Sequence, residues 1–186
     1  MSIRKICLHV WSKWDPIYFS FSRLDFVKNE WGKQTIIRVR LTRYKGRNIT
    51  LMDGTIIHKN DLLIKIHLHN VKLLKEIQTH NSDIRRAFII YKNVEQALPL
   101  LASYIHSHVH NNQIKGIIGI TTLHKGCKKL GFEVFPLRNP YYKRMKQMAL
   151  FPIHFISSAR LKKEIPPPMY LMMSKDDLLK KYPVKQ

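Results

Sequence analysis

The sequence predicts a single α+β domain in which a mixed or antiparallel β-sheet packs against several helices. Its 186 residues are the length of one ordinary domain. Apolar and polar residues alternate in strand-like runs around residues 35–70, and helical spacing of apolar residues begins near residue 83. The composition, with 45% apolar and 24% charged residues, is that of a globular protein.

Composition divides the chain into an aromatic, basic N-terminal segment (1–33), an α+β core (34–158) and a Pro-rich basic tail with a short terminal helix (159–186). The N-terminal segment contains all three tryptophans, interleaved with Lys and Arg. That combination is typical of segments at a membrane interface, and equally of aromatic side chains that pack on a core. In the tail, consecutive prolines predict an extended linker, because proline cannot continue a helix.

Strand patterning is strongest at residues 35–70. In the first strand of this stretch, Arg38 and Arg40 alternate with apolar residues, so basic and apolar side chains occupy opposite faces. In the last strand, Lys65 and His67 alternate with apolar residues in the same way. If these strands pair, the sheet has one apolar face and one basic face, an arrangement common in antiparallel sheets.

The later elements follow in order along the chain. A short helix is expected after Asn70, and a longer helix capped by Asp83 follows it. The continuous apolar run at 114–123 predicts a central strand that is buried on both faces. A short strand at 132–137 and a basic helix at 140–151 complete the predicted core.

The net charge of +21, from 33 Lys and Arg against 12 Asp and Glu, indicates anionic partners such as nucleic acids, anionic lipids or phosphorylated molecules. Cys7 and Cys127 form no C-x-x-C pair, so a disulfide framework is not expected. No apolar stretch reaches the roughly 20 residues that span a bilayer. We therefore expect a cytoplasmic protein that makes peripheral contact with the inner face of the membrane.

The clearest candidate site lies on the basic face of the predicted strands. Arginine offers a two-pronged donor to phosphate or carboxylate groups, and histidine can donate or accept a proton near neutral pH. Two alternatives remain: a solvated sheet face without a ligand, and a metal site on the two histidines that lacks a third ligand. The predicted ligand-binding residues are Arg38, Arg40, Lys65, Asn70, His124 and Lys125, and the predicted catalytic residues are His67 and His69.

His124 and Lys125 belong to this prediction because they follow a buried strand, where the start of a helix attracts anions. No cofactor is expected, since Gly116 and Gly119 lie in a strand-like run and not in a nucleotide-binding glycine loop. No bound metal is predicted either. Whether the chain catalyses a reaction stays open, and the sequence does not define an oligomeric state.

Two blocks of sequence carry a resemblance to a known family. The run RVRLTRYKGRNITLMDGTIIHKNDLLIKIHLHN, followed by IKGIIGITTLHKGCKKLGFEVFPL, resembles the YkoP-like domain of bacteria. The resemblance extends over roughly residues 14–158. Such domains also occur fused after polysaccharide deacetylase domains, which implies an association with envelope glycan or glycolipid processing. The resemblance carries no assigned activity, and this chain lacks the paired aspartates and histidine motif of the deacetylases.

The leading expectation is a protein that binds an anionic glycan or lipid-linked intermediate at the cytoplasmic membrane surface, in envelope polysaccharide metabolism. In a catalytic version, His67 or His69 transfers the proton while Arg38 and Arg40 hold the charged part of the substrate. The alternative class is a nucleic-acid-binding protein, because aromatic residues beside Lys and Arg suit base stacking and phosphate contact. A third class is a partner subunit that docks through the Pro-rich tail.

Overall fold

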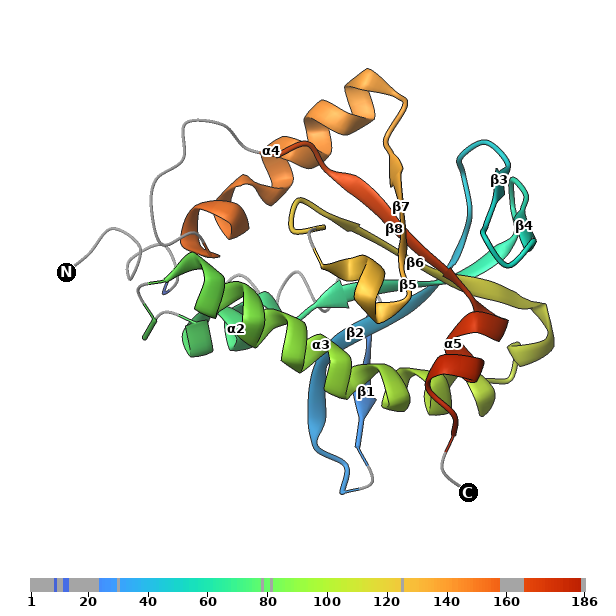
Figure 1. Ribbon diagram of the computed structural model, residues 1–186, viewed down its shortest axis with the longest axis horizontal. Helices are drawn as coiled ribbons and strands as arrows, with labels where there is room; N and C mark the ends of the chain where they lie inside the picture. The colour runs from blue at the N-terminus through green and yellow to red at the C-terminus, as the bar shows by residue number, and fades with distance from the viewer. Residues whose placement is uncertain are drawn as a thin grey trace.

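Figure 1 shows the computed structural model, in which a six-stranded mixed sheet lies at the centre and helices pack around it. The structure describes residues 9, 12–13, 24–29, 31–77, 79–80, 82–124, 126–157 and 166–184. The predicted α+β fold with a mixed sheet is confirmed. Most of the N-terminal segment lies outside the described residues, so its expected role at a membrane interface stays a prediction.

The sheet has the order β1-β2-β5-β6-β8-β7, and its neighbouring strands are antiparallel except for the parallel pair β5 and β6. Its strands are β1 (Asp25–Lys28), β2 (Gln34–Arg43), β5 (Leu62–Leu68), β6 (Ile114–Thr121), β7 (Glu133–Pro136) and β8 (Met169–Ser174). A parallel pair needs a long crossover, and the chain between β5 and β6 supplies it with two helices.

These two helices are α2 (Asn70–Ile77) and α3 (Asp83–His106). Two more helices, α4 (Pro140–Ser157) and α5 (Lys175–Lys181), flank β8 in the sequence. Short 3-10 helices at Asn111–Gln113 and Cys127–Leu130 and a small hairpin of β3 (Ile49–Thr50) and β4 (Ile56–Ile57) complete the fold. Within the described ranges, none of the helices is apolar over a length that would cross a bilayer.

The apolar face of the sheet packs against α3 and α5. Leu98, Leu101 and Ile105 lie at helical spacing along α3 and are fully buried. They belong to one buried cluster with Ile37 of β2 and Ile64 of β5, two strand positions that point to the same face. This cluster holds α3 against the sheet, because burial of apolar side chains is the main driving force of folding.

On the opposite face, the β3–β4 hairpin supplies a second buried cluster. Leu51 and Ile57 of this region pack with Leu63 of β5, Ile118 of β6 and Met172 of β8. The central strand β6 is therefore covered on both faces, as the apolar run at its position predicts.

Side-chain caps and one glycine set the ends of several helices, with one correction to the sequence analysis. Gly131 ends a short helix in the left-handed conformation, with φ of 94°. The side chain of Ser174 caps α5, the predicted terminal helix. The prediction that Asp83 caps α3 is wrong: Ser82 does so, and Asp83 falls in the first turn, where a carboxylate favours the helix dipole.

The structure differs most from the sequence analysis at β8. The sequence pattern suggests only a Pro-rich tail with a terminal helix after residue 158, yet Met169–Ser174 form a strand between β6 and β7. Met172 and Met173 are buried on opposite faces of this strand. The run gives a weak strand signal because it is short, follows prolines and is rich in methionine, which is not among the residues enriched in strands.

Substituting a methionine of β8 tests its place in the core. Met173 is 2% exposed, so Met173→Ala should lower the free energy of unfolding by about 2–4 kcal/mol through lost burial and a residual cavity. Met52→Ala is the matched control, because Met52 is 90% exposed and its change should stay within about 0.5 kcal/mol. Urea unfolding measures both. Equal, small effects of the two substitutions would contradict the position of β8.

Candidate functional site

Two pairs of basic residues face each other across β2 and β5. Arg40 lies directly opposite Lys65, and Arg38 lies directly opposite His67. Side chains at such positions share one face of the sheet with Cβ atoms about 5 Å apart, and like charges there destabilise the pairing. The sequence prediction that these four residues share a face is therefore confirmed by the register of the strands.

Helix α4 adds a fifth basic residue. Lys146 and Tyr142 lie one turn apart on α4, and the Lys146 ammonium is 5.4 Å from the centroid of the Tyr142 ring. The charge of Arg40 lowers the pKa of Lys146, after the larger effect of burial, so α4 faces the basic side of the sheet. We call the set of Arg38, Arg40, Lys65, His67 and Lys146 the basic cluster.

Burial and mutual repulsion shift the pKa values inside the basic cluster. Burial is the largest cause for His67, followed by the positive charges of the other four members, and together they lower its pKa to about 3. Burial, then Lys146 and Arg40, lowers the pKa of Lys65 to about 8. Every charge that acts on these two residues is positive. At neutral pH the His67 imidazole is thus neutral, while a fraction of Lys65 is the free amine.

Some buried nitrogen atoms of the cluster lack a hydrogen-bond partner within the described residues. Arg40 Nε and His67 Nε2 are buried and have no hydrogen-bond partner there. Neither Lys65 nor Lys146 forms an ion pair with a carboxylate in that part of the chain. A buried cationic group without a partner is costly, so this arrangement favours the entry of an anion.

The nearest carboxylate in the same row of the sheet is remote. The register carries this row from Arg40 and Lys65 through β6 and β8 to Glu133 on β7. Four strand spacings of about 4.8 Å put Glu133 about 19 Å from Arg40. Glu133 Oε1 moreover accepts a hydrogen bond from the backbone N–H of Met52 at 2.8 Å. The row is therefore basic on β2 and β5 and acidic on the edge strand β7.

Arg38 and His69 meet at the edge of the basic cluster. Nη2 of the buried Arg38 lies 3.2 Å from both ring nitrogens of His69. The Arg38 guanidinium carbon also lies 4.9 Å from the centroid of the Phe26 ring, a cation–π arrangement. His69 and Phe26 thus orient Arg38, whereas His67 sits inside the cluster. The two histidines that the sequence treats as equivalent have different surroundings.

Tyrosine side chains border the cluster. The pKa of Tyr170 is raised to about 12 by burial first and then by Tyr142 and Tyr44, so both of these tyrosines lie near Tyr170. Burial also raises the pKa of Tyr142, against the opposing charge of Arg40. All three hydroxyls therefore stay protonated at neutral pH and can donate hydrogen bonds beside the cationic groups.

The structure brings together only part of the predicted site. Arg38, Arg40, Lys65 and His67 lie in the basic cluster, and His69 contacts Arg38. Asn70 is the first residue of α2. His124 follows β6 and has a buried Nδ1 without a partner in the described part, and none of the charges acting on His67 comes from it. Lys125 lies outside the described residues.

Sequence reasoning missed three residues beside the cluster. Lys146 and Tyr142 were expected only in a basic helix, although their spacing of one helical turn could have indicated a shared face. Tyr170 was missed together with β8.

Metal and thiol chemistry find no support among the described residues. That part of the chain has no group of three or more His, Cys, Asp and Glu side chains that could hold a metal ion. Burial raises the pKa of the Cys127 thiol to about 11, so it is not a reactive thiolate at neutral pH.

The low pKa of His67 predicts a pH dependence of stability. As the pH falls from 6.5, the ordinary pKa of histidine, towards 3, His67 binds a proton in the unfolded chain but not in the folded protein. Stability should fall through this window by up to about 1.4 kcal/mol per pH unit from this residue alone. His67→Gln should reduce the loss between neutral and mildly acidic pH, as measured by urea unfolding. The control is His106→Gln at the exposed end of α3, and equal losses in both variants would refute the assignment.

Comparison with known proteins gives the family. The family model described as the YkoP domain matches residues 4–182. The uncharacterized protein YkoP of Bacillus subtilis (strain 168) is 46% identical over 183 residues, which cover 97% of this chain and 99% of that relative. No solved structure matches. The resemblance found in the sequence is confirmed, and the chain belongs to the YkoP domain family.

Proposed function

We propose that this protein binds an anionic, sugar-containing ligand in the basic cluster. The observation that carries the proposal is the meeting of Arg40, Lys65 and Lys146 around His67, where only positive charges act. A bound anion would offset part of that positive field, relieve the repulsion between Arg40 and Lys65, and accept a hydrogen bond from Arg40 Nε.

The chemistry of the cluster supports a phosphate or carboxylate group in the ligand. Arginine presents a planar fork that matches either group, and lysine supplies a compact charge. The neutral His67 can donate one further hydrogen bond from Nε2 in the matching tautomer. Tyr142 and Tyr170 offer ring faces and hydroxyl donors beside the anion, which suits a sugar attached to it.

The ligand class that fits this description is an anionic glycan or a lipid-linked sugar phosphate. The proposal includes a role in envelope polysaccharide metabolism at the cytoplasmic face of the membrane, as the sequence resemblance implies. If the bound ligand reacts, the free amine of Lys65 is the group that can take up a proton at neutral or slightly alkaline pH, and His67 can do so only once the negative charge of the ligand raises its pKa. Arg40 and Lys146 then hold the charged part of the ligand, and His69 positions Arg38.

Removal of one cation of the cluster tests this function. Lys146→Gln should weaken binding of pyrophosphate and of a short-chain prenyl-pyrophosphate sugar by at least about tenfold, since a charge-assisted hydrogen bond contributes about 1.5–3 kcal/mol. The matched control is Lys143→Gln, because Lys143 is exposed on the same helix. Isothermal titration calorimetry measures both affinities. Equal affinities of wild type and Lys146→Gln for both probes would rule out the basic cluster as the binding site.

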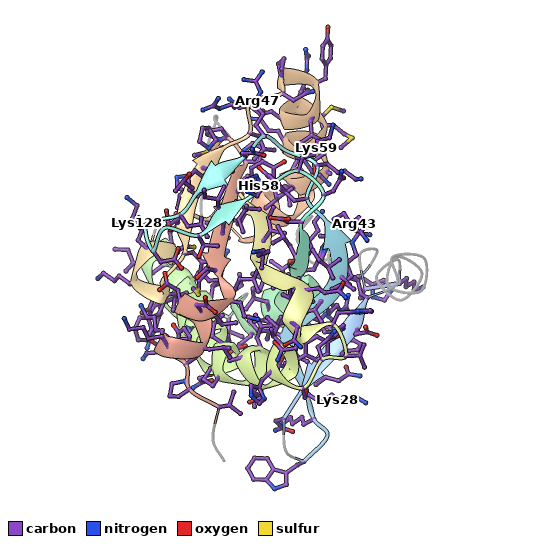
Figure 2. All side chains as sticks on the ribbon, turned by 90° about the vertical axis from the view of Figure 1, so that its right-hand side faces the viewer. Lys28, Arg43, Arg47, His58, Lys59 and Lys128 are labelled. Atoms are coloured by element: carbon purple, nitrogen blue, oxygen red, sulfur yellow. The ribbon has the colours of Figure 1, made fainter. Side chains whose placement is uncertain are left out.

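A second candidate, binding of nucleic acid, is supported by a different surface. Figure 2 shows Arg47 and Lys59 on the β3–β4 hairpin region, away from the sheet. Both side chains are exposed, as is Lys45. Exposed bases of this kind suit sequence-independent contact with phosphates. The same titrations can be run with a single-stranded oligonucleotide. This second function would be favoured if the oligonucleotide binds wild type, binds Arg47→Gln more weakly, and binds Lys146→Gln as tightly as wild type.

A further inference from the structure

Helix α4 has two faces of different character. Tyr142 and Lys146 occupy the face towards the basic cluster. The opposite face carries large apolar side chains that are between 48% and 86% exposed: Tyr141, Met145, Met148 and Phe151. Their spacings of four, three and three residues keep them on one side of a helix that turns about 100° per residue. The helix therefore presents an apolar stripe to its surroundings, which we call the α4 stripe.

Basic residues are part of the same exposed surface. Arg144 falls within the α4 stripe, and Lys143 lies between the stripe and the face of Lys146; both are exposed. Among the described residues, neither side chain forms an ion pair with a carboxylate. Contiguous exposed apolar surface on a protein marks an interaction site. Because the α4 stripe combines basic and apolar residues, only certain kinds of partner can bind to it.

A second copy of the chain is a poor occupant. Each copy has a net charge of +21, so two copies repel each other before their stripes meet. In a dry contact, the guanidinium of Arg144 would be buried between like charges, which is costly without a carboxylate partner.

An anionic bilayer surface avoids both costs. Methionine, tyrosine and phenylalanine side chains can enter the boundary between headgroups and acyl chains. Long basic side chains reach up from the same depth to lipid phosphates, so Arg144 and Lys143 add to binding. We propose that the α4 stripe docks the protein on the surface of membranes that contain anionic lipids.

The surroundings of α4 agree with this docking surface. In both views α4 and the β3–β4 hairpin reach towards the same end of the molecule (Figure 1, Figure 2). Arg47 is exposed at that end and adds another positive charge. The inference goes beyond the proposed ligand binding, because the stripe and the basic cluster occupy opposite faces of α4. Membrane docking and ligand binding can therefore be tested, and refuted, independently of each other.

Vesicle flotation with the full chain tests the inference. Wild type should bind vesicles of mixed phosphatidylglycerol and phosphatidylcholine, and bind pure phosphatidylcholine far less. Met145→Ser/Met148→Ser should lower the partition coefficient on the anionic vesicles by about tenfold, since two apolar side chains no longer leave water. The control is Ile84→Ser/Val109→Ser, which changes two residues that are 84% and 89% exposed elsewhere and should leave partitioning unchanged.

Three results would overturn the inference. One is failure of wild type to bind the anionic vesicles, and another is equal partitioning of wild type and Met145→Ser/Met148→Ser. The third is a self-association, seen by analytical ultracentrifugation, that disappears in the double variant, because it would make the stripe a contact between copies. Pyrophosphate titration of Met145→Ser/Met148→Ser, without vesicles, keeps the two proposals separate: its affinity should equal that of wild type.

Discussion

The like-charge pairing across β2 and β5 is the constraint around which this surface is organised. The charges of Arg40 and Lys65 oppose the strand pairing that places them together, whereas the buried Arg38 lies opposite the uncharged His67. The apolar residues on the other face of the same strands hold them in register, because a shift by one residue would expose the core and bury the bases. The core thus stabilises a surface that would not assemble by itself.

The sequence pattern predicts the basic face of β2 and β5, but it does not predict the residues of other elements that join this face. Alternation along 35–70 is enough to predict that Arg38, Arg40, Lys65 and His67 share a face, because the period of a strand is two. The different positions of His67 and His69 depend on contacts with other elements, such as Phe26, which no local pattern contains. Lys146 reaches the cluster only because α4 lies against the basic side of the sheet. This contact between distant parts of the chain cannot be read from a local sequence pattern.

The two faces of α4 connect the two proposals in space. Lys146 and Tyr142 point towards the sheet, while the exposed methionines point away from it. A ligand with an anionic group and a lipid tail could therefore leave its tail in the bilayer while its headgroup meets the cluster. The pKa of about 8 for Lys65 makes the charge of such a site responsive to pH near neutrality.

The position of β8 has a consequence for the order in which the chain folds. β7 pairs with β8 alone in the sheet, although β7 precedes it in sequence by a whole helix. During synthesis β7 therefore has no strand partner until Met169–Ser174 have emerged from the ribosome. Until then β6 also exposes the edge that β8 later covers, and an uncovered apolar edge invites pairing with other chains. Completion of the sheet thus depends on a segment that is made only after β7 and the whole of α4.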